Sequence, residues 1–404
     1  DGAGCFAFYP FNNNPLKESP RRADNSVWLV DTIKSLIAET GQPEFLDEVL
    51  PYRDSAQDTI YGHILAGLQY IWRHRGGTGL PVMMDADWND GLAVFRDPRA
   101  ESVMLGMQLL RAAHEFKELA LLKNRRQDAQ WCDTVADQLK AILNSDKVWD
   151  GHWYRRLLTT TGLKIGSASR PQGKIYLEPQ VWSALCGVGL ADGRARAAMD
   201  SAFDHLNTEL GLRICAPSYT GIPNPDDPLT SNKPGTGENG SIFCHANAWA
   251  VIAECLLKNP GRAWQYFMQI LPSVASARIG QDRFRNEPYV FSSTFDGPDS
   301  PHFGRGGISW LTGTASWMYI AATQYLLGIH PTLAGLKIKP CLPDSISAVQ
   351  VSRLFRGTRY EIHLERKPVH RTPEPPPIIV NGHPLKKPVL PIAPGKTINV
   401  LAFF

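Results

Sequence analysis

The chain has 404 residues, and its 42 Lys and Arg against 39 Asp and Glu give a formal net charge of +3. Hydrophobic residues make up 43% and charged residues 20%, a balance typical of a globular protein, which excludes a disordered chain. So small a charge, with no long run of Lys and Arg, argues against a nucleic-acid partner. The longest apolar stretches, such as Ile320–Leu327, are too short to span a membrane.

Seven cysteines are scattered along the chain, odd in number and never in a CxxC spacing. Such usage favours a reducing compartment, and it argues against a disulfide framework and a zinc site. Cys186, Cys244 and Cys255 lie among apolar residues of predicted helices, where a buried thiol is simply a small hydrophobe. The chain also starts at Asp1 without Met or a signal segment, which indicates a processed or truncated piece. We therefore expect a cytoplasmic protein without a bound metal.

Amphipathic helices are predicted for most of the chain up to about residue 330. In Val27–Thr40, apolar residues recur at helical spacing, and Gly41 and Pro43 end the pattern. The same periodicity predicts further helices over Thr59–Arg73, Ser102–Lys123, Trp131–Leu143, Val181–Leu190, Arg194–Leu206, Asn247–Leu257, Ala263–Leu271 and Ser316–Leu327. Such a succession, with few convincing strands, favours helical hairpins packed around a common centre, as in an (α/α) toroid whose loops build the site.

The pattern changes after Gly328, where short strand-like segments replace the helices. These are predicted at Val349–Val351, Tyr360–Leu364, Ile378–Val380 and Thr397–Ala402. The pair Asn381-Gly382 is a good signal for a two-residue hairpin turn. We therefore expect a mainly α chain in two parts, a helical toroid over residues 1–330 and a small C-terminal β domain over residues 331–404.

The first segment that could carry chemistry spans residues 84–92. It holds three aspartates, an asparagine and a tryptophan, namely Asp85, Asp87, Trp88, Asn89 and Asp90. This composition suits neither a helix face nor a core strand. One interpretation is a turn whose side chains bond to its own backbone. In the other, Trp88 packs on a sugar while an aspartate donates a proton to a leaving oxygen, and the residue types favour neither.

Two further segments lead into predicted helices. In residues 234–245, Glu238 can bind hydroxyl groups and His245 lies at a helix entrance, where an anion is favoured. Taken alone, a Gly-rich turn with a capping or buried histidine is the simpler interpretation. In residues 304–315, Thr312 and Thr314 resemble N-cap residues, and Gly313 leaves its amide open to a ligand. Most helix starts of this kind are only caps.

In this order and at these separations, the three segments resemble those of glycoside hydrolase family 94. That family holds the inverting phosphorylases of cellobiose, chitobiose and related β-glucans, and the phosphorylase-like part of cyclic β-1,2-glucan synthases. The resemblance extends from about Pro10 to Glu365. It includes four further segments, Ala23–Leu29, Glu178–Trp182, Glu287–Val290 and Gly335–Pro343.

The resemblance implies an (α/α)6 toroid that is incomplete at its N-terminal side, because family members carry a β-sandwich domain, a linker and an Arg- and Asp-bearing segment before this point. It implies an enzyme that transfers a glycosyl unit from a β-linked oligosaccharide to inorganic phosphate, without a cofactor, giving an α-sugar 1-phosphate. Phosphate is already an anionic nucleophile, so one positioned acid is enough. The resemblance places the general acid on Asp90, substrate contacts on Asp87, Trp88 and Glu238, and phosphate contacts on His245, Thr312 and Gly313.

Some positions depart from the family pattern. Asn25 stands where the family often has a second aspartate, Ser293 where some members have a sugar-binding glutamine, and Gly237 where many have lysine. No residue convincingly replaces the family's phosphate-binding arginines, so we expect weak phosphate binding.

Two rival hypotheses stay open. One is an inverting hydrolase with the same fold, which needs a second carboxylate facing Asp90 to activate water. The other is a non-catalytic sugar-binding module. The expected partners are a β-linked oligosaccharide and phosphate, with a homodimer as an open alternative to a monomer.

Overall fold

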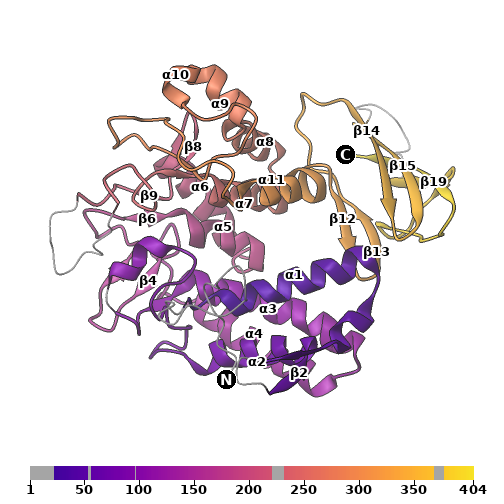
Figure 1. Ribbon diagram of the computed structural model, residues 1–404, viewed down its shortest axis with the longest axis horizontal. Coiled ribbons are helices and arrows are strands. Elements are labelled where there is room, and N and C mark those ends of the chain that lie inside the picture. The colour runs from indigo at the N-terminus through magenta and orange to yellow at the C-terminus, as the bar shows by residue number, and fades with distance from the viewer. Residues whose placement is uncertain (1–21, 53–55, 96, 221–231, 368–376) are drawn as a thin grey trace.

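The computed structural model describes residues 22–52, 56–95, 97–220, 232–367 and 377–404. Cys5 and the Pro10 end of the family resemblance lie outside these residues. Helices form the larger part of the molecule, and the C-terminal strands lie together at one end of it (Figure 1). Within the described ranges, no helix is both long enough and apolar enough to cross a membrane.

Every helix predicted from the sequence is present, with ends that differ by up to four or five residues. The described α-helices are α1 (Asn25–Thr40), α2 (Ile60–Arg73), α3 (Val103–Leu122), α4 (Arg126–Leu143), α5 (Leu177–Cys186), α6 (Arg194–Leu206), α7 (Cys244–Leu256), α8 (Pro260–Gln269), α9 (Pro272–Ile279), α10 (Gln281–Phe284) and α11 (Thr314–Ile320). A π-helical segment, Ala321–Leu326, continues α11, and short 3-10 helices span Pro43–Asp47 and Asp90–Phe95. Helices α9 and α10 were not predicted, because in 8 and 4 residues the helical period recurs too few times to stand out from the sequence.

Local side-chain bonds set several helix ends. The Thr59 hydroxyl accepts a hydrogen bond from the Gly62 amide at 3.0 Å, and so caps the start of α2. The Ser102 hydroxyl caps α3 in the same way, over 3.1 Å from the amide of Leu105. Gly41 ends α1 in the left-handed conformation, with φ of 76°, where a side chain would be strained.

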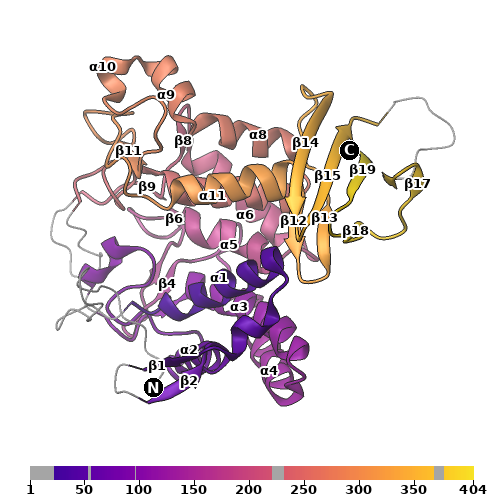
Figure 2. The same cartoon turned by 45° about the vertical axis from the view of Figure 1, so that its right-hand side comes forward.

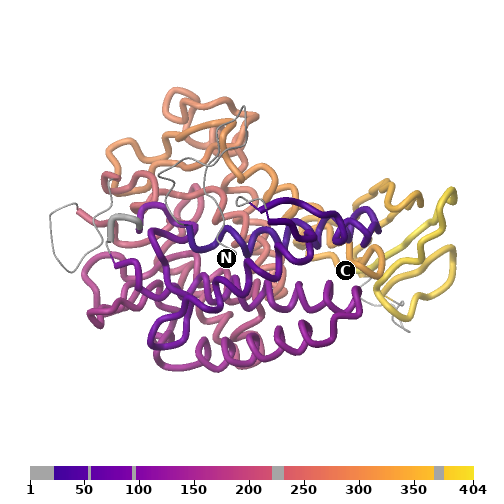
Figure 3. The backbone as a smooth tube through the Cα atoms, turned by 60° about the horizontal axis from the view of Figure 1, so that its bottom comes forward, coloured from indigo at the N-terminus to yellow at the C-terminus, as the bar shows by residue number. Residues whose placement is uncertain are grey.

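Five of the described helices pack on one another in chain order: α1 on α3, α3 on α5, α5 on α7, and α7 on α11. Each of the first four has a second helix beside it, with α2 on α1, α4 on α3, α6 on α5 and α8 on α7. Figure 2 shows α1, α5 and α11 running toward the C-terminal strands, and Figure 3 shows α3 and α4, in purple, side by side along the lower edge. The helical hairpins expected from the sequence are therefore confirmed as the main architecture.

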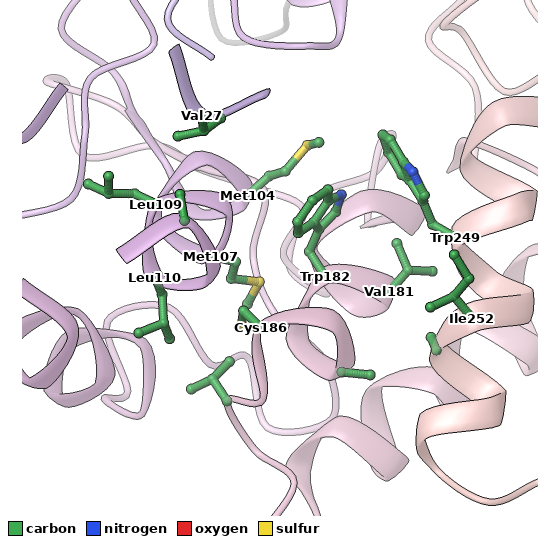
Figure 4. Packing of buried hydrophobic residues seen from close by; sticks show 14 of the residues in the cluster. Val27, Met104, Met107, Leu109, Leu110, Val181, Trp182, Cys186, Trp249 and Ile252 are labelled. Atoms are coloured by element: carbon green, nitrogen blue, oxygen red, sulfur yellow. The ribbon is translucent and has the colours of Figure 1, made fainter. Parts of the chain in front are cut away.

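Four of these helices contribute a tryptophan to one central cluster. The ring of Trp28 on α1 lies 5.7 Å from Trp182 on α5 and 6.2 Å from Trp317 on α11, centre to centre. It also stacks on Trp249 of α7 at 6.0 Å, and Trp249 is fully buried. Figure 4 shows Trp182 and Trp249 in the core beside Met104 of α3. The Trp28–Trp317 pair joins α1, the first helix of the series, to α11, the last. Each aromatic pair stabilises the packing of the helices beyond the effect of its buried area.

The C-terminal strands form two sheets. The five-stranded sheet has the order β14 (Ala348–Phe355), β15 (Thr358–Glu365), β19 (Thr397–Phe403), β16 (Ile378–Val380) and β17 (His383–Pro384). Strands β15 and β19 are parallel and the other pairs antiparallel. The smaller sheet contains β12 (Ile329–Thr332), β13 (Gly335–Ile338) and β18 (Val389–Leu390). The four predicted strands lie within β14, β15, β16 and β19, and Asn381-Gly382 forms the predicted turn between β16 and β17.

The loops between helices contain short strand pairs that the sequence analysis missed. A pairing of two or three residues gives no alternating pattern to detect. They are β1 (Val49–Pro51) with β2 (Gln57–Thr59), β3 (Glu101–Ser102) with β4 (Leu157–Leu158) and β5 (Lys164–Ile165), β6 (Ile175–Tyr176) with β9 (Cys215–Ala216), β7 (Asn207–Thr208) with β8 (Gly211–Leu212), and β10 (Ile242–Phe243) with β11 (Thr294–Phe295).

Candidate active site

Backbone pairing brings the three sequence segments together. The β10–β11 pair joins residues 242–243 to residues 294–295, and the Ser293 amide donates to the Ile308 carbonyl over 2.7 Å. On the other side, Arg22 forms β-bridges with Met84 and Ala86, which place the start of α1 against the aspartate-rich loop. Loops far apart in the sequence thereby meet above the tryptophan cluster.

These loops enclose a cavity of about 340 Å³. Every residue that the sequence analysis proposed for the site lines it, namely Asp87, Trp88, Asp90, Glu238, His245, Thr312 and Gly313. The lining also contains residues that the analysis did not propose, namely Arg22, Asp24, Asn25, Trp28, Phe243, Ser293 and Leu311. The volume suits one or two sugar rings rather than a polymer, since small-molecule sites span roughly 300–1,000 Å³. The placement is established; the individual roles stay predictions.

Asp90 is the first residue of a 3-10 helix, and half of its side chain is open, with 51% exposed. Its Oδ1 lies 2.7 Å from Nε of Arg22, whose side chain is only 10% exposed. The expectation that no residue replaces the family's phosphate-binding arginines stays a prediction, although a guanidinium does stand in the cavity. The sequence alone did not indicate Arg22 as a site residue, because it stands 68 residues before Asp90 and only the fold brings the two together.

A buried network holds the loop that carries Asp90. Both terminal nitrogens of Arg156 donate to the carboxylate of Asp87 over 2.7 Å, and the Ser102 hydroxyl donates to the same carboxylate over 2.6 Å. The side-chain amide nitrogen of Asn89, Nδ2, donates to Oε1 of Glu178 over 2.7 Å. Burial by itself raises the pKa of Asp87, but the charge and hydrogen bonds of Arg156 outweigh it and the pKa is lowered. Asp87 is therefore an ionised, internally bonded carboxylate that fixes the loop, and its contact with substrate stays a prediction.

Glu178 and Arg156 were not proposed as site residues, although the sequence analysis quoted Glu178 as part of a motif. Burial raises the pKa of Glu178, and the positive charge of Arg156 only partly opposes this. Both side chains are fully buried. They act on the site through the loop and not by contact with the cavity.

Trp88 is half-buried and packs edge-on against the ring of His245, with 5.2 Å between centres. It is tilted on Trp249 at 4.7 Å and meets Phe243 edge-on at 5.0 Å. One part of the indole is thus fixed by aromatic neighbours while another part faces the cavity. This arrangement suits stacking against a sugar ring.

His245 lies in the first turn of α7, with its ring 4.6 Å from that of Trp249. Burial lowers the pKa of His245 to about 3, so the imidazole is neutral at physiological pH. Among the described atoms, its Nε2 is buried without a hydrogen-bond partner. A buried polar atom without a partner is costly, and a ligand in the cavity would satisfy it.

Gly313 brings the start of α11 against His245. A Cβ placed on Gly313 would lie 3.1 Å from Cε1 of His245, closer than side chains normally approach. Gly313 itself is the N-cap residue of α11, and the Thr312 hydroxyl accepts from the Thr314 amide over 3.1 Å. The expectation that Thr312 and Thr314 resemble N-cap residues is therefore wrong, because Gly313 is the N-cap and Thr314 is already the first helical residue.

Two further carboxyl groups face the cavity. Burial raises the pKa of Asp24 to about 7. A hydrogen bond from Nε1 of Trp28 at 2.7 Å lowers this pKa, whereas the negative charges of Asp87 and Asp90 raise it. Burial also raises the pKa of Glu238, whose Oε2 accepts a hydrogen bond from Asn232 over 2.7 Å. Asp24 stands in a motif that the sequence analysis recognised, but nothing in a single sequence marked its carboxyl as titrating near neutrality.

No group of three or more His, Cys, Asp and Glu side chains is arranged to hold a metal ion in the part of the chain that the structure describes. The polar groups of the cavity are carboxyls, an imidazole, a guanidinium, hydroxyls and the side-chain amide of Asn25. They can bind sugar hydroxyls, hold an anion and transfer a proton.

Comparison with known proteins agrees with the site. The family described as the glycosyl hydrolase 94 superfamily, catalytic domain, matches residues 11–328. An N,N'-diacetylchitobiose phosphorylase of Vibrio proteolyticus is 33% identical over 94% of this chain and 47% of its own length. A solabiose phosphorylase of Paenibacillus borealis is 33% identical over 85% of this chain and 45% of its own length. The chain thus spans about half the length of these relatives.

Among solved structures, a sialidase shares the fold with a TM-score of 0.57 at 15% identity, over 86% of this chain and 30% of that one. At that identity the likeness concerns the fold alone. The family match covers most of the helical part and all three site segments. This chain belongs to the glycosyl hydrolase 94 superfamily.

Proposed function

We propose that this chain carries the inverting phosphorolysis of a β-linked glycoside, with inorganic phosphate as co-substrate. The observation that carries the proposal is the lining of one cavity, where a half-open aspartate meets a guanidinium, a neutral imidazole and a helix start. A proton donor and an anion site in one sugar-sized space are what phosphorolysis requires. The names of the relatives support the same reaction class.

In this mechanism Asp90 protonates the glycosidic oxygen while phosphate attacks the anomeric carbon from the other face. The bond to the leaving sugar breaks, and the product is an α-sugar 1-phosphate. Oδ1 of Asp90 lies 2.7 Å from Nε of Arg22. We propose that bound phosphate takes over the guanidinium, since a phosphate dianion competes strongly for it. The carboxyl of Asp90 can then approach the glycosidic oxygen and act as the general acid.

The phosphate contacts proposed for His245, Thr312 and Gly313 rest on their proximity. The neutral His245 ring lies against Gly313, and the imidazole has one N–H to donate. The start of α11 adds its amides and the Thr312 hydroxyl. Trp88 and Glu238 serve the sugar, through ring stacking and hydroxyl contacts respectively.

The substrate class that we propose is a β-linked disaccharide or short oligosaccharide. The cavity volume of about 340 Å³ supports a small ligand. Ser293 faces the cavity where some family members have glutamine, so the contact that selects the sugar differs from theirs.

We propose that the helices belong to an (α/α)6 toroid, of which the described residues supply five inner helices. Five helices in chain order, α1, α3, α5, α7 and α11, support this within the described residues. A groove of about 650 Å³ between α1 and α11, lined by Asp31 and Glu39 on one side and Trp317 and Tyr319 on the other, lies where a sixth would pack. The β part after residue 330 stays a separate domain in this proposal. The free cysteines fit a cytoplasmic location, and a homodimer stays an open expectation.

The rival hydrolase gains some support from the extra carboxyls. An inverting hydrolase needs an ionised base opposite the acid. Asp24, with a pKa of about 7, is roughly half ionised at neutral pH, and its carboxyl faces the same cavity as Asp90. This candidate predicts cleavage in the absence of phosphate.

The test is to incubate the full chain with cellobiose and with N,N'-diacetylchitobiose, each with and without phosphate, and to separate the products chromatographically. Phosphate-dependent cleavage supports phosphorolysis. Cleavage that needs no phosphate supports the hydrolase, and sugar binding without cleavage supports the non-catalytic module. The Asp90→Asn variant, run in parallel, shows whether any cleavage comes from this site.

A further inference from the structure

A second cavity, of about 530 Å³, lies between the helical part and the C-terminal β part. Its walls come from the last turn of α7, the π-helical segment after α11, and the strand and loop that include Lys337–Leu342. It shares no lining residue with the cavity that contains Asp90. None of the chemistry proposed above uses it.

Two cysteines from different parts of the chain meet in this cavity. Cys255 lies in the last turn of α7 and is 7% exposed, and Cys341 is partly exposed in the loop after β13. The Cys255 thiol donates a hydrogen bond to the sulfur of Cys341. Helix α7 holds Cys255, and the Cys341 amide donates to the Leu326 carbonyl over 2.9 Å. Two thiols that share a hydrogen bond are neighbours, and a disulfide bond would bring their sulfur atoms to about 2.05 Å.

The two thiols are chemically unequal. The hydrogen bond from Cys255 lowers the pKa of Cys341 against the effect of burial, and the charge of Lys339 lowers it further. The same hydrogen bond, together with burial, raises the pKa of Cys255. Because the thiolate is the nucleophile, Cys341 attacks first and Cys255 follows.

The cavity carries an excess of positive charge. Lys258, Lys337, Lys339 and Arg366 line it, against a single side-chain carboxylate, that of Asp344, which is bonded to Arg366 over 2.7 Å. A site lined by one sign of charge raises the local concentration of ligands of the opposite sign. A disulfide compound that carries carboxylates is therefore favoured over a neutral one.

We propose that Cys255 and Cys341 form a thiol–disulfide exchange site for an anionic low-molecular-weight disulfide, of the chemical class of glutathione disulfide. The Cys341 thiolate attacks one sulfur of that disulfide, whose S–S bond breaks, and one thiolate leaves and takes up a proton. Cys255 then loses its proton and attacks the Cys341 sulfur, which releases the second thiol. Two protein thiols are oxidised and one disulfide is reduced to two thiols. The product is a disulfide bond that joins α7 to the loop after β13, and so links the helical part to the β part.

The test uses the full chain in glutathione disulfide, followed by alkylation of the remaining thiols and peptide mass mapping. The expected result is a Cys255–Cys341 cross-link, with the loss of two hydrogens. In Cys255→Ser, which has no second thiol to resolve the intermediate, Cys341 is expected to retain one glutathionyl group. Cys132→Ser serves as the matched control: Cys132 is buried, burial raises its pKa to about 12, and its removal leaves the cross-link unchanged.

A charge variant tests separately whether the cations of this cavity attract the anionic disulfide. Lys258→Gln removes a cation of the cavity that is not among the charges lowering the pKa of Cys341. It is expected to slow the reaction with glutathione disulfide roughly threefold at low salt, and to leave the reaction with neutral 2-hydroxyethyl disulfide unchanged. Two results together would overturn the proposal. In the wild-type chain, Cys255 and Cys341 are both found alkylated after treatment with glutathione disulfide, and in Cys255→Ser, Cys341 carries no glutathionyl group. Equal slowing with both disulfides overturns the part played by the cations. Circular dichroism shows that each variant is folded, and no readout depends on sugar cleavage.

Discussion

Two aspartates three residues apart show how burial separates a fixed ion pair from an exchangeable one. Asp87 is fully buried and bonded to Arg156 through both oxygens, so it has no freedom to change partner. Asp90 is half open, and its Oδ1 lies 2.7 Å from Nε of Arg22. Water reaches the Asp90 side of this pair, so exchanging its partner costs less than in a fully buried pair. Asp90 is therefore the residue of the loop that is able to react.

Replacing Asp90 by Asn is expected to remove turnover while preserving the fold. The change deletes a proton donor and keeps the shape, and a general acid typically contributes about 10²–10⁴-fold. Initial rates of phosphate-dependent cleavage measure the effect. Asp97→Asn is the matched control, because Asp97 lies in the same loop but bonds to Thr160 outside the cavity. Near-normal rates in Asp90→Asn would mean that the acid is another residue.

Replacing Arg156 by Met is expected to destabilise the protein by about 3–5 kcal/mol, because it leaves the carboxylate of Asp87 buried without a partner. Urea unfolding measures the change. Lys123→Met removes one partner of the exposed Lys123–Asp47 pair and is expected to cost less than about 1 kcal/mol. Equal losses in the two variants would show that the Arg156 network does not hold the loop.

Asp24 makes stability depend on pH. Its pKa rises from 3.8 to about 7 on folding, so the folded chain binds more protons than the unfolded chain between these values. Stability from this group is therefore highest below about pH 4 and falls as the pH rises to 7, by roughly 4 kcal/mol at most. Asp24→Asn should remove this loss, so its stability relative to wild type should increase from pH 5 to pH 8. Urea unfolding at both pH values tests this, and a constant difference would contradict it.

At the level of helices and strands, the pattern of apolar residues was enough to predict the long elements. The helices from α1 to α8 and the strands β14 and β15 repeat one period several times, so a single sequence reveals them. The short pairs such as β10–β11 have no such signal, because only tertiary contacts stabilise them. Yet these pairs bring His245 and Thr312 into one cavity. The candidate residues were therefore predictable by resemblance, but their meeting point was not predictable from periodicity.

The residues that sequence reasoning missed share a physical cause. Arg22 and Arg156 matter through partners 68 and 69 positions away along the chain, and Asp24 matters through its burial. Neither a distant partner nor the degree of burial is written in the local sequence.

The starts of α7 and α11 lie against each other at His245 and Gly313, so Gly313→Ala is expected to weaken phosphate binding. A methyl group there would lie 3.1 Å from the His245 ring and would push the two apart. We expect the KM for phosphate to rise roughly tenfold, equivalent to about 1.4 kcal/mol, with little change in the KM for sugar. Gly261→Ala on α8 is the matched control, because nothing lies within 4 Å of a Cβ there. A rise in the sugar KM alone would place the anion elsewhere.

At the scale of the whole molecule, the site lies where the loops of the helical series meet, above four tryptophans from α1, α5, α7 and α11. The cluster gives the cavity a rigid floor, and the loops supply the chemistry. The chain spans about half the length of its relatives, and a groove remains between α1 and α11. Activity of this chain by itself therefore depends on what fills the groove between α1 and α11 as well as on the residues of the cavity.

The most direct test of phosphorolysis in this cavity is a phosphorus NMR time course with the full chain, a β-linked disaccharide and inorganic phosphate. The account predicts a growing signal of a sugar 1-phosphate, with the anomeric proton in the α configuration, and no such signal with Asp90→Asn. Release of reducing sugar at the same rate with no phosphate ester, or a β-configured ester, would contradict it.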